Sequence, residues 1–230
     1  MKFTNAENWR EDLFNRWPQD WPDKSKHVIP HDVTVAQYEE LVALLDAKAG
    51  EREIEMFLTR NREALSMVIW LFSTGHHMSW IFPKAPFRPS VGEVGGLIPD
   101  YLVAGANSMG VQYFVLELKG PDKRAFVKQG KRVYLSAEAN KGVCQLMNYL
   151  DYAARDQAYL RDSLQLHQFR EPTGVLLIGT DEETEDPQVR QFKAAWNRMN
   201  PQIMIRSYSA LQRTMLSKLQ DHRKLPTVEK

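Results

Sequence analysis

Two acidic side chains and one amine stand at matching ends of a predicted β-hairpin. Residues 98–120 read IPDYLVAGANSMGVQYFVLELKG, with Asp100 before one apolar run and Glu117 and Lys119 closing the next. Because side chains alternate along a strand, Glu117 and Lys119 share a face and Leu118 points into the core. A turn centred near Ser108–Met109, just off the centre of GANSMG, would place Asp100 opposite Glu117. The sequence alone does not fix this register, and a bulge would shift it.

This arrangement suits one kind of chemistry. Two carboxylates about 4 Å apart repel by roughly 4 kcal/mol at an effective dielectric of about 20, so such a pair calls for a cation between them. Mg²⁺ and Mn²⁺ prefer carboxylate, carbonyl and water oxygens. A neighbouring lysine can orient or deprotonate a metal-bound water and offset charge on a phosphorus centre. The pattern therefore predicts metal-assisted hydrolysis of a phosphodiester.

A second pair of polar residues lies on a predicted helix over about residues 137–156. Gln145 and Tyr149 are four positions apart, so they share one helix face. They could bind a phosphate, a base edge or Lys119, although an ordinary amphipathic helix has the same spacing. Glu-x-Lys alone is also common, because charged residues often protect a sheet edge. Pro99 before Asp100 and the Gly-Pro step after Lys119 make the combination more specific.

Together these segments resemble the PD-(D/E)xK nuclease superfamily, and more closely the nuclease domain of the Shedu family of bacterial anti-phage proteins. The resemblance runs from about Glu51 to Tyr152. It includes EREIEMFLTRNREAL, which is similar to the family's Glu-rich helix ending in a short Asn-x-x-x-Leu turn. It implies a restriction-endonuclease-like α/β core and a Mg²⁺-dependent DNA endonuclease in phage defence, with Mn²⁺ able to substitute.

The resemblance also implies roles for individual residues. The expected catalytic set is Asp100, Glu117, Lys119, Gln145 and Tyr149, with Lys119 positioning the attacking water. The expected metal ligands are Asp100, Glu117, the Leu118 carbonyl and one acid from the first helix of the domain. Glu51 lies at the edge of that helix's apolar stripe and is favoured over Glu55, although both could be surface acids.

Positive charge gathers directly after the hairpin. Seven basic and two acidic residues lie between positions 119 and 141, giving +5 within a chain of net charge +1. Such a loop could neutralise DNA phosphates, whereas most charged loops are only solvated. The residues expected to bind DNA are Lys123, Arg124, Lys128, Lys131, Arg132 and Lys141.

Two rival functions fit the same residues. One is a non-catalytic nucleic-acid-binding or scaffold protein that keeps the nuclease fold. The other is a restriction or repair nuclease of the same superfamily. Retention of the charged site residues weighs against the first, because an acid cluster without its metal lowers stability.

The remaining segments predict how the site is positioned. Helical periodicity covers about residues 35–45, 54–65, 137–156, 189–199 and 209–219, and strands are expected at about 79–82, 98–104, 111–118, 175–178 and 203–205. Thr34 is the expected N-cap of the first helix and Gly50 its stop. This order predicts an α/β fold with a mixed central sheet flanked by helices.

The first part of the chain is expected to be an irregular arm. Trp9, Trp17 and Trp21 lie among three prolines, with a possible short helix at residues 8–16. The tryptophans could pack onto the domain or form a homo-oligomer contact, since aromatic residues are enriched in interfaces. We expect residues 1–48 to form this arm and a helix, and residues 49–230 to form the nuclease-like domain.

Composition narrows the class of protein. The chain has 230 residues, 43% of them hydrophobic, and a single cysteine, which excludes an intramolecular disulfide framework. Its longest strongly apolar run, Met67–Phe72, is too short to cross a bilayer. We therefore expect a cytoplasmic protein without a membrane partner.

Overall fold

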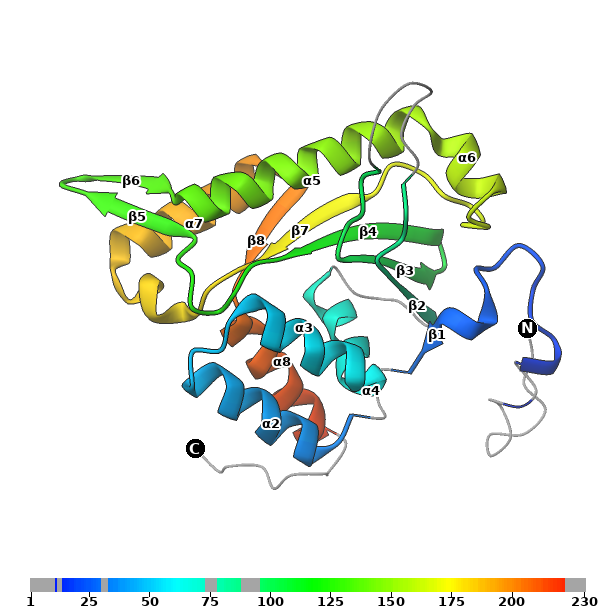
Figure 1. Ribbon diagram of the computed structural model, residues 1–230, viewed down its shortest axis with the longest axis horizontal. Coiled ribbons are helices and arrows are strands. Elements are labelled where there is room, and N and C mark those ends of the chain that lie inside the picture. Colours follow the sequence, from blue (N-terminus) through cyan, green and yellow to red (C-terminus); the bar gives the residue numbers. More distant parts are fainter. Residues whose placement is uncertain (1–10, 12–13, 30–32, 73–77, 88–95, 222–230) are drawn as a thin grey trace.

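A mixed six-stranded sheet runs through the molecule in the computed structural model, which describes residues 11, 14–29, 33–72, 78–87 and 96–221 (Figure 1). The strands lie in the order β1-β2-β3-β4-β7-β8; β1 to β4 are antiparallel neighbours, and β4, β7 and β8 are parallel. Their bounds are β1 His27–Val28, β2 Met78–Pro83, β3 Tyr101–Asn107, β4 Gly110–Leu118, β7 Thr173–Leu177 and β8 Ile203–Arg206. The predicted mixed α/β fold is confirmed.

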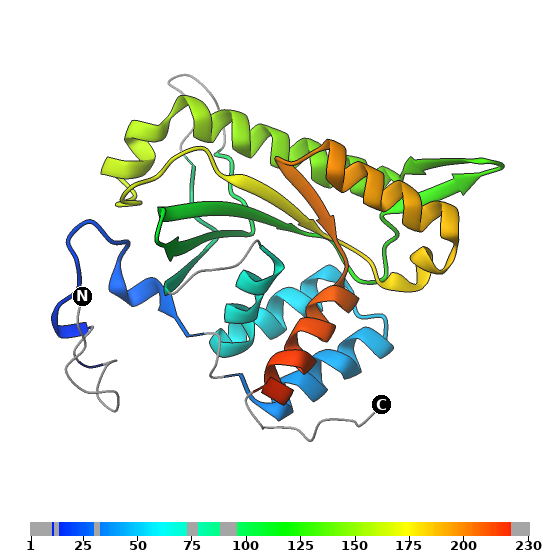
Figure 2. The same cartoon turned by 180° about the vertical axis from the view of Figure 1, so that it is seen from behind.

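Helices cover both faces of this sheet (Figures 1 and 2). One face carries α5 Ala137–Arg155, α6 Gln157–Asp162 and α7 Pro187–Met199. The other carries α2 Val35–Asp46, α3 Glu51–Arg60, α4 Arg62–Ser66, the 3₁₀ helix η3 Met67–Leu71 and α8 Tyr208–Asp221. Two further 3₁₀ helices are η1 Lys24–Lys26 and η4 Asp181–Glu185. Each layer buries its own apolar cluster, so the sheet separates two cores.

The β3–β4 hairpin has the register that the sequence predicts. Asn107 pairs with Gly110 across a two-residue turn, and Tyr101 pairs with Leu116 at the far end. Strand β3 begins later and continues further than predicted, because only the two residues between Asn107 and Gly110 form the turn. The same register, extended by one residue, places Asp100 opposite Glu117.

Two helix boundaries differ from the prediction. Thr34 caps α2 as expected, with Gln37 completing a capping box, but the helix ends at Asp46. Gly50 is the N-cap of α3 and not the stop of α2, because Lys48 already turns the chain with a φ of 52°. The predicted second helix is interrupted at Asn61, whose side-chain amide donates to the Phe57 carbonyl and separates α3 from α4.

The basic segment after β4 is a hairpin, where the sequence predicted a loop. Strands β5 (Phe126–Gln129) and β6 (Arg132–Leu135) pair antiparallel and extend away from the body (Figure 1). Gly130 begins their two-residue turn with a φ of 59°, a conformation that glycine adopts without strain. Phe126 anchors the hairpin by packing edge-on against Phe192 of α7, with ring centroids 5.6 Å apart.

A side chain closes the open edge of β8. The Asn197 amide of α7 donates to the Ile205 carbonyl at 3.1 Å and accepts from the Ile205 N–H at 2.8 Å. These are the outward-facing backbone groups that another strand would otherwise bind.

Within the N-terminal arm, Trp17 and Trp21 pack on the domain, and Trp9 lies outside the described residues. Trp17 and Trp21 contact each other and the fully buried Trp80 of β2, with ring centroids 5.4–6.0 Å apart. The helix expected at residues 8–16 lies mostly outside the described residues. Leu41 and Leu45 of α2 enter the same core as α3, and the division of the chain at residue 48 stays a prediction. None of the helices in the described ranges is long and apolar enough to span a membrane.

Candidate functional site

Three charged residues form a row across the end of the sheet. The register that pairs Pro83 with Tyr101 continues to Lys84 and Asp100, whose backbones are joined by a hydrogen bond of 2.9 Å from the Lys84 N–H. Asp100 in turn lies opposite Glu117 on β4. Its carboxylate contacts the Lys84 ammonium at 2.6 Å and accepts the Leu118 N–H at 2.7 Å. Asp100 is therefore held from both neighbouring strands.

Glu117 and Lys119 form a buried ion pair. The Lys119 Nζ lies 2.8 Å from Glu117 Oε1, and the two residues expose only 6% and 3% of their surface. Burial raises the pKa of the Glu117 carboxyl above its usual 4.5, and the nearby Asp100 carboxylate raises it further, against the opposing effect of Lys119. A buried carboxylate such as that of Glu117 is stabilised by a positive charge beside it, which the Lys119 ammonium group supplies.

The two acids predicted on the first helix of the domain, Glu51 and Glu55, lie near different members of this row. Glu51 begins α3. Partial burial of its carboxyl raises its pKa, the Lys119 ammonium group opposes this shift, and the Asp100 carboxylate adds to it. Gly120 allows this approach, because a Cβ there would lie 3.1 Å from the Glu51 backbone nitrogen. Glu55, one turn further along, contacts Lys84 at 2.9 Å.

Helix α5 adds the predicted aromatic and amide residues. The Tyr149 hydroxyl donates to the Ile98 carbonyl at 3.3 Å, just before Asp100. Burial raises the pKa of Tyr149 to about 12, and the carboxylates of Glu117 and Asp100 contribute to this shift. Gln145 Oε1 is buried and receives no hydrogen bond from the described part of the chain. The structure thus brings Tyr149 and Gln145 to the same end of the sheet as Asp100, Glu117 and Lys119.

The donor set for a metal is small. Within the described ranges, no group of three His, Cys, Asp or Glu side chains is arranged to hold a metal ion. Asp100 and Glu117 face each other across the hairpin, and Mg²⁺ needs only one or two carboxylates when water and phosphate supply the rest. Leu118 turns its side chain to the opposite core, as predicted. The two carboxylates are matched at present by the ammonium groups of Lys84 and Lys119.

Lys84 is the site residue that sequence reasoning missed. Its ammonium group contacts the carboxylates of Asp100 and Glu55. Burial alone would lower the pKa of Lys84, but its hydrogen bonds to these two carboxylates raise the pKa above 10.5. The available signal was its position directly after the β2 segment, where an antiparallel neighbour of β3 would end. Using that signal needs the β2–β3 register, which no tight turn fixes.

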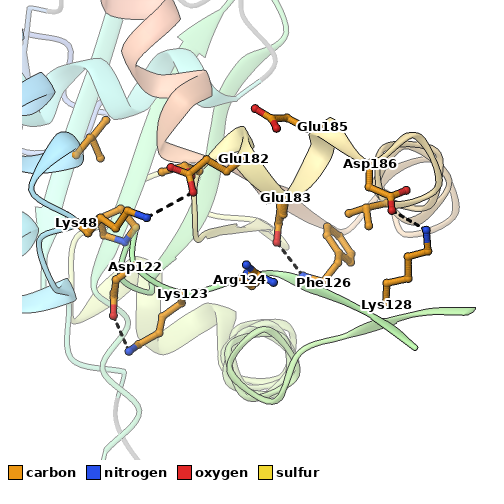
Figure 3. Close-up of a pocket in the computed structure, with 14 residues that line it drawn as sticks. Lys48, Asp122, Lys123, Arg124, Phe126, Lys128, Glu182, Glu183, Glu185 and Asp186 are labelled. Carbon is orange, nitrogen blue, oxygen red and sulfur yellow. Dashed lines mark hydrogen bonds and ion pairs between the residues drawn. The ribbon is translucent and has the colours of Figure 1, made fainter. Parts of the chain in front are cut away.

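The predicted DNA-binding residues divide into two groups. Lys123 pairs with Asp122 at 2.7 Å, and Lys128 of β5 pairs with Asp186 at 2.6 Å, so acidic partners already match these two charges (Figure 3). The others are exposed and have no ion pair among the described residues; they are Arg124, Lys131, Arg132 and Lys141.

An acidic segment binds the base of the β5–β6 hairpin. Glu183 of η4 accepts the N–H groups of Ala125 and Phe126 at 2.8 and 3.1 Å, and burial raises its pKa. Figure 3 shows this contact beside the pairs of Lys48 with Glu182 and Lys128 with Asp186, around a cavity of about 500 Å³. The segment at 181–186 therefore fixes the hairpin and reduces its net charge.

The comparisons with known proteins assign the family. The family model described as Shedu protein SduA, C-terminal, matches residues 48–211 of the 230. The chain belongs to the Shedu family. The comparison with curated proteins finds no match. Membership of the Shedu family suggests a role in anti-phage defence, and the matched range contains the whole row from Lys84 to Lys119 together with α5.

Proposed function

We propose that this Shedu protein is a metal-dependent DNA endonuclease with a PD-(D/E)xK core. The observation that carries the proposal is the meeting of Asp100, Glu117 and Lys119 at one end of β3 and β4. Two carboxylates opposed across a hairpin, with a buried amine beside one of them, suit the binding of a hard cation and a phosphodiester. Family membership supports phage defence as the setting.

The residues present fit Mg²⁺, with Mn²⁺ as a substitute. Asp100 and Glu117 would hold the ion with the Leu118 carbonyl, and Glu51 is the nearest further acid on α3. When bound, the ion supplies a Lewis acid that polarises a phosphate oxygen. The Lys84 ammonium group neutralises the Asp100 carboxylate in the structure, so a metal ion that binds Asp100 would compete with Lys84.

The chain's own groups would orient the reaction. Lys119 is held by Glu117, which fixes the amine where it can position a water and stabilise negative charge on the phosphate. Tyr149 and Gln145 line the same place from α5. The Gln145 Oε1 atom, which has no hydrogen-bond partner among the described residues, can accept a hydrogen bond from a base edge. The DNA phosphates would be bound by the exposed basic residues Arg124, Lys131, Arg132 and Lys141.

A plasmid-nicking assay tests the proposal. Supercoiled DNA is incubated with Mg²⁺ or Mn²⁺ and wild-type protein, the E117Q/K119M double variant, or Lys24→Gln as a distant control. The double variant removes a whole buried ion pair and leaves no uncompensated charge, so it should fold. We expect cleavage by wild type and control, and at least about a hundredfold loss in the double variant.

Equal cutting by the double variant would place the active site elsewhere. Thermal unfolding of each variant separates loss of chemistry from loss of the fold. Omission of the metal should abolish cleavage by the wild type, and restoring it should recover the rate.

A non-catalytic DNA-binding role is the second candidate. The observation that favours it is Lys84, which neutralises Asp100 and Glu55 within the protein and leaves a balanced site without any added cation. This candidate predicts salt-sensitive DNA binding with no nicking at any metal concentration. The Lys84→Met variant distinguishes the two, because an endonuclease whose metal site this lysine opposes should then need less Mg²⁺.

A further inference from the structure

A second polar cavity lies at the β8 edge of the sheet. It has a volume of about 350 Å³ and is lined by η4, α7, the end of β8 and the start of α8. These elements face the viewer in Figure 2, whereas α3 and α5, which flank the candidate site, are nearer in Figure 1.

The lining of this cavity is strongly cationic. Four basic side chains reach it against one carboxylate, that of Asp181; they are Arg190, Lys193, Arg206 and Arg213. Among the described residues, Arg190 donates to the backbone carbonyls of Thr184 and Glu185, at 3.1 and 3.3 Å. Arg206 Nε is buried and has no hydrogen-bond partner among the described residues. The cavity thus holds more positive charge than its own acid balances.

The single Asp181 carboxylate contacts two of the four cationic side chains. It accepts the Ser207 hydroxyl at 2.5 Å and contacts Arg213 at 2.6 Å, while Lys193 is further away at 3.7 Å. Burial would raise the pKa of Asp181, but these hydrogen bonds lower it, so its charge is stable. For Lys193, burial is the largest effect and lowers the pKa even though Asp181 and Glu183 oppose it.

The N-terminus of α8 adds to the same field. Ser207 precedes this 14-residue helix and its hydroxyl accepts the Ala210 N–H at 3.3 Å, and Ala210 lines the cavity. Helix N-termini carry partial positive charge and favour phosphate. Arginine forks and an ammonium group are the side chains that bind phosphate oxygens best.

We propose that this cavity binds the di- or triphosphate group of a small molecule. Its volume is that of a small-ligand pocket, and four cationic side chains line it against one lining carboxylate, which Lys193 and Arg213 share. Arg190 and Arg206 have no ion pair among the described residues. The lining residues supply guanidinium and ammonium donors, which recognise phosphate oxygens. The proposal stands independently of nuclease activity.

Titration of the full chain with inorganic pyrophosphate tests the site. Binding is measured by calorimetry at constant ionic strength, with sulfate as the competing simple anion, and by the rise in melting temperature that a ligand of the folded state causes. Lys193→Met keeps the side-chain length, and Arg190→Lys keeps the charge but loses the fork. Arg198→Gln, exposed on the same helix, is the matched control.

The wild type and Arg198→Gln should bind pyrophosphate equally, and Lys193→Met should weaken binding by about tenfold or more. Arg190→Lys should weaken it less than Lys193→Met does. Three results would overturn the site: no binding by the wild type at millimolar pyrophosphate, an equal loss in the control, or sulfate competing as well as pyrophosphate. A loss of duplex affinity in Lys193→Met without pyrophosphate binding would reassign these cations to a DNA backbone.

Discussion

At the scale of single residues, the candidate site depends on charges that are buried in pairs. The sequence offered the facing of Asp100 and Glu117 as one possible register, and the two-residue turn between Asn107 and Gly110 selects it. The contact of Lys84 with Asp100 was not predicted, because no short turn in the sequence fixes the register of β2 against β3. The sequence shows the two carboxylates but not the Lys84 ammonium group that pairs with Asp100. It therefore suggests a metal site more strongly than the structure does.

Glu117 should make stability depend on pH. Its pKa is raised above 4.5 by burial, so at mildly acidic pH the folded chain holds a proton that the unfolded chain has lost. Stability should therefore fall as pH rises from about 4.5 through the folded pKa, by at most about 1.4 kcal/mol per pH unit for this group. Glu117→Gln cannot lose that proton, and the variant should lack this part of the slope.

The measurement is urea unfolding of the wild type and Glu117→Gln in metal-free buffer across mildly acidic to neutral pH. The difference between the two curves isolates this carboxyl from the other raised acids, Glu51 and Glu183. Parallel curves would show that Glu117 titrates normally in the folded protein.

At the scale of elements, the long helices and strands follow their sequence patterns and the short ones do not. Helix α5 and strand β4 were predicted within a few residues, because their periodicity extends over many positions. Strands β5 and β6 have four residues each, one of them basic in each strand, so Gly130 was the clearest local sign of their turn. Their fixation by Glu183 joins residues 57 and 58 positions apart in the sequence, which no local pattern reveals.

The tip of the β5–β6 hairpin should provide DNA contacts. Lys131 and Arg132 are exposed and without ion pairs among the described residues, so replacing both by Gln should weaken duplex binding uniformly across sequences. The slope of log affinity against log salt should fall by about 2. Fluorescence anisotropy over a series of NaCl concentrations measures it.

Lys24→Gln with Lys26→Gln is the control for that experiment, since η1 lies at the opposite end of the molecule (Figure 1). The hairpin has no role in binding if both double variants keep the wild-type slope. Lys128→Gln should have a smaller effect than either tip residue, because Asp186 already pairs with Lys128.

At the scale of the whole molecule, one sheet separates two cores and the N-terminal arm closes the β1 side. The two alternatives for the tryptophans were packing on the domain and contact between copies. Trp17 is enclosed by Trp21, His27 and Trp80 at 5.4–6.0 Å, and its indole N–H donates to the Pro22 carbonyl. These contacts use the ring surface within one chain, which is the first alternative.

Trp17→Ala should therefore lower stability without changing the oligomeric state. We expect a loss of roughly 2–3 kcal/mol from the aromatic contacts, measured by urea unfolding. The melting temperature of the wild type should stay the same at low and high protein concentration if the arm acts only within the chain. A melting temperature that rises with concentration in the wild type, and no longer in the variant, would assign Trp17 to an interface.

The Asn197 amide has a consequence for how copies can meet. By occupying both outward groups of Ile205, it leaves β8 unable to recruit a strand from another molecule. The opposite border, β1, is only two residues long and offers little to recruit with. Continuous sheets across neighbouring chains are thereby discouraged at both borders of the sheet that the structure describes.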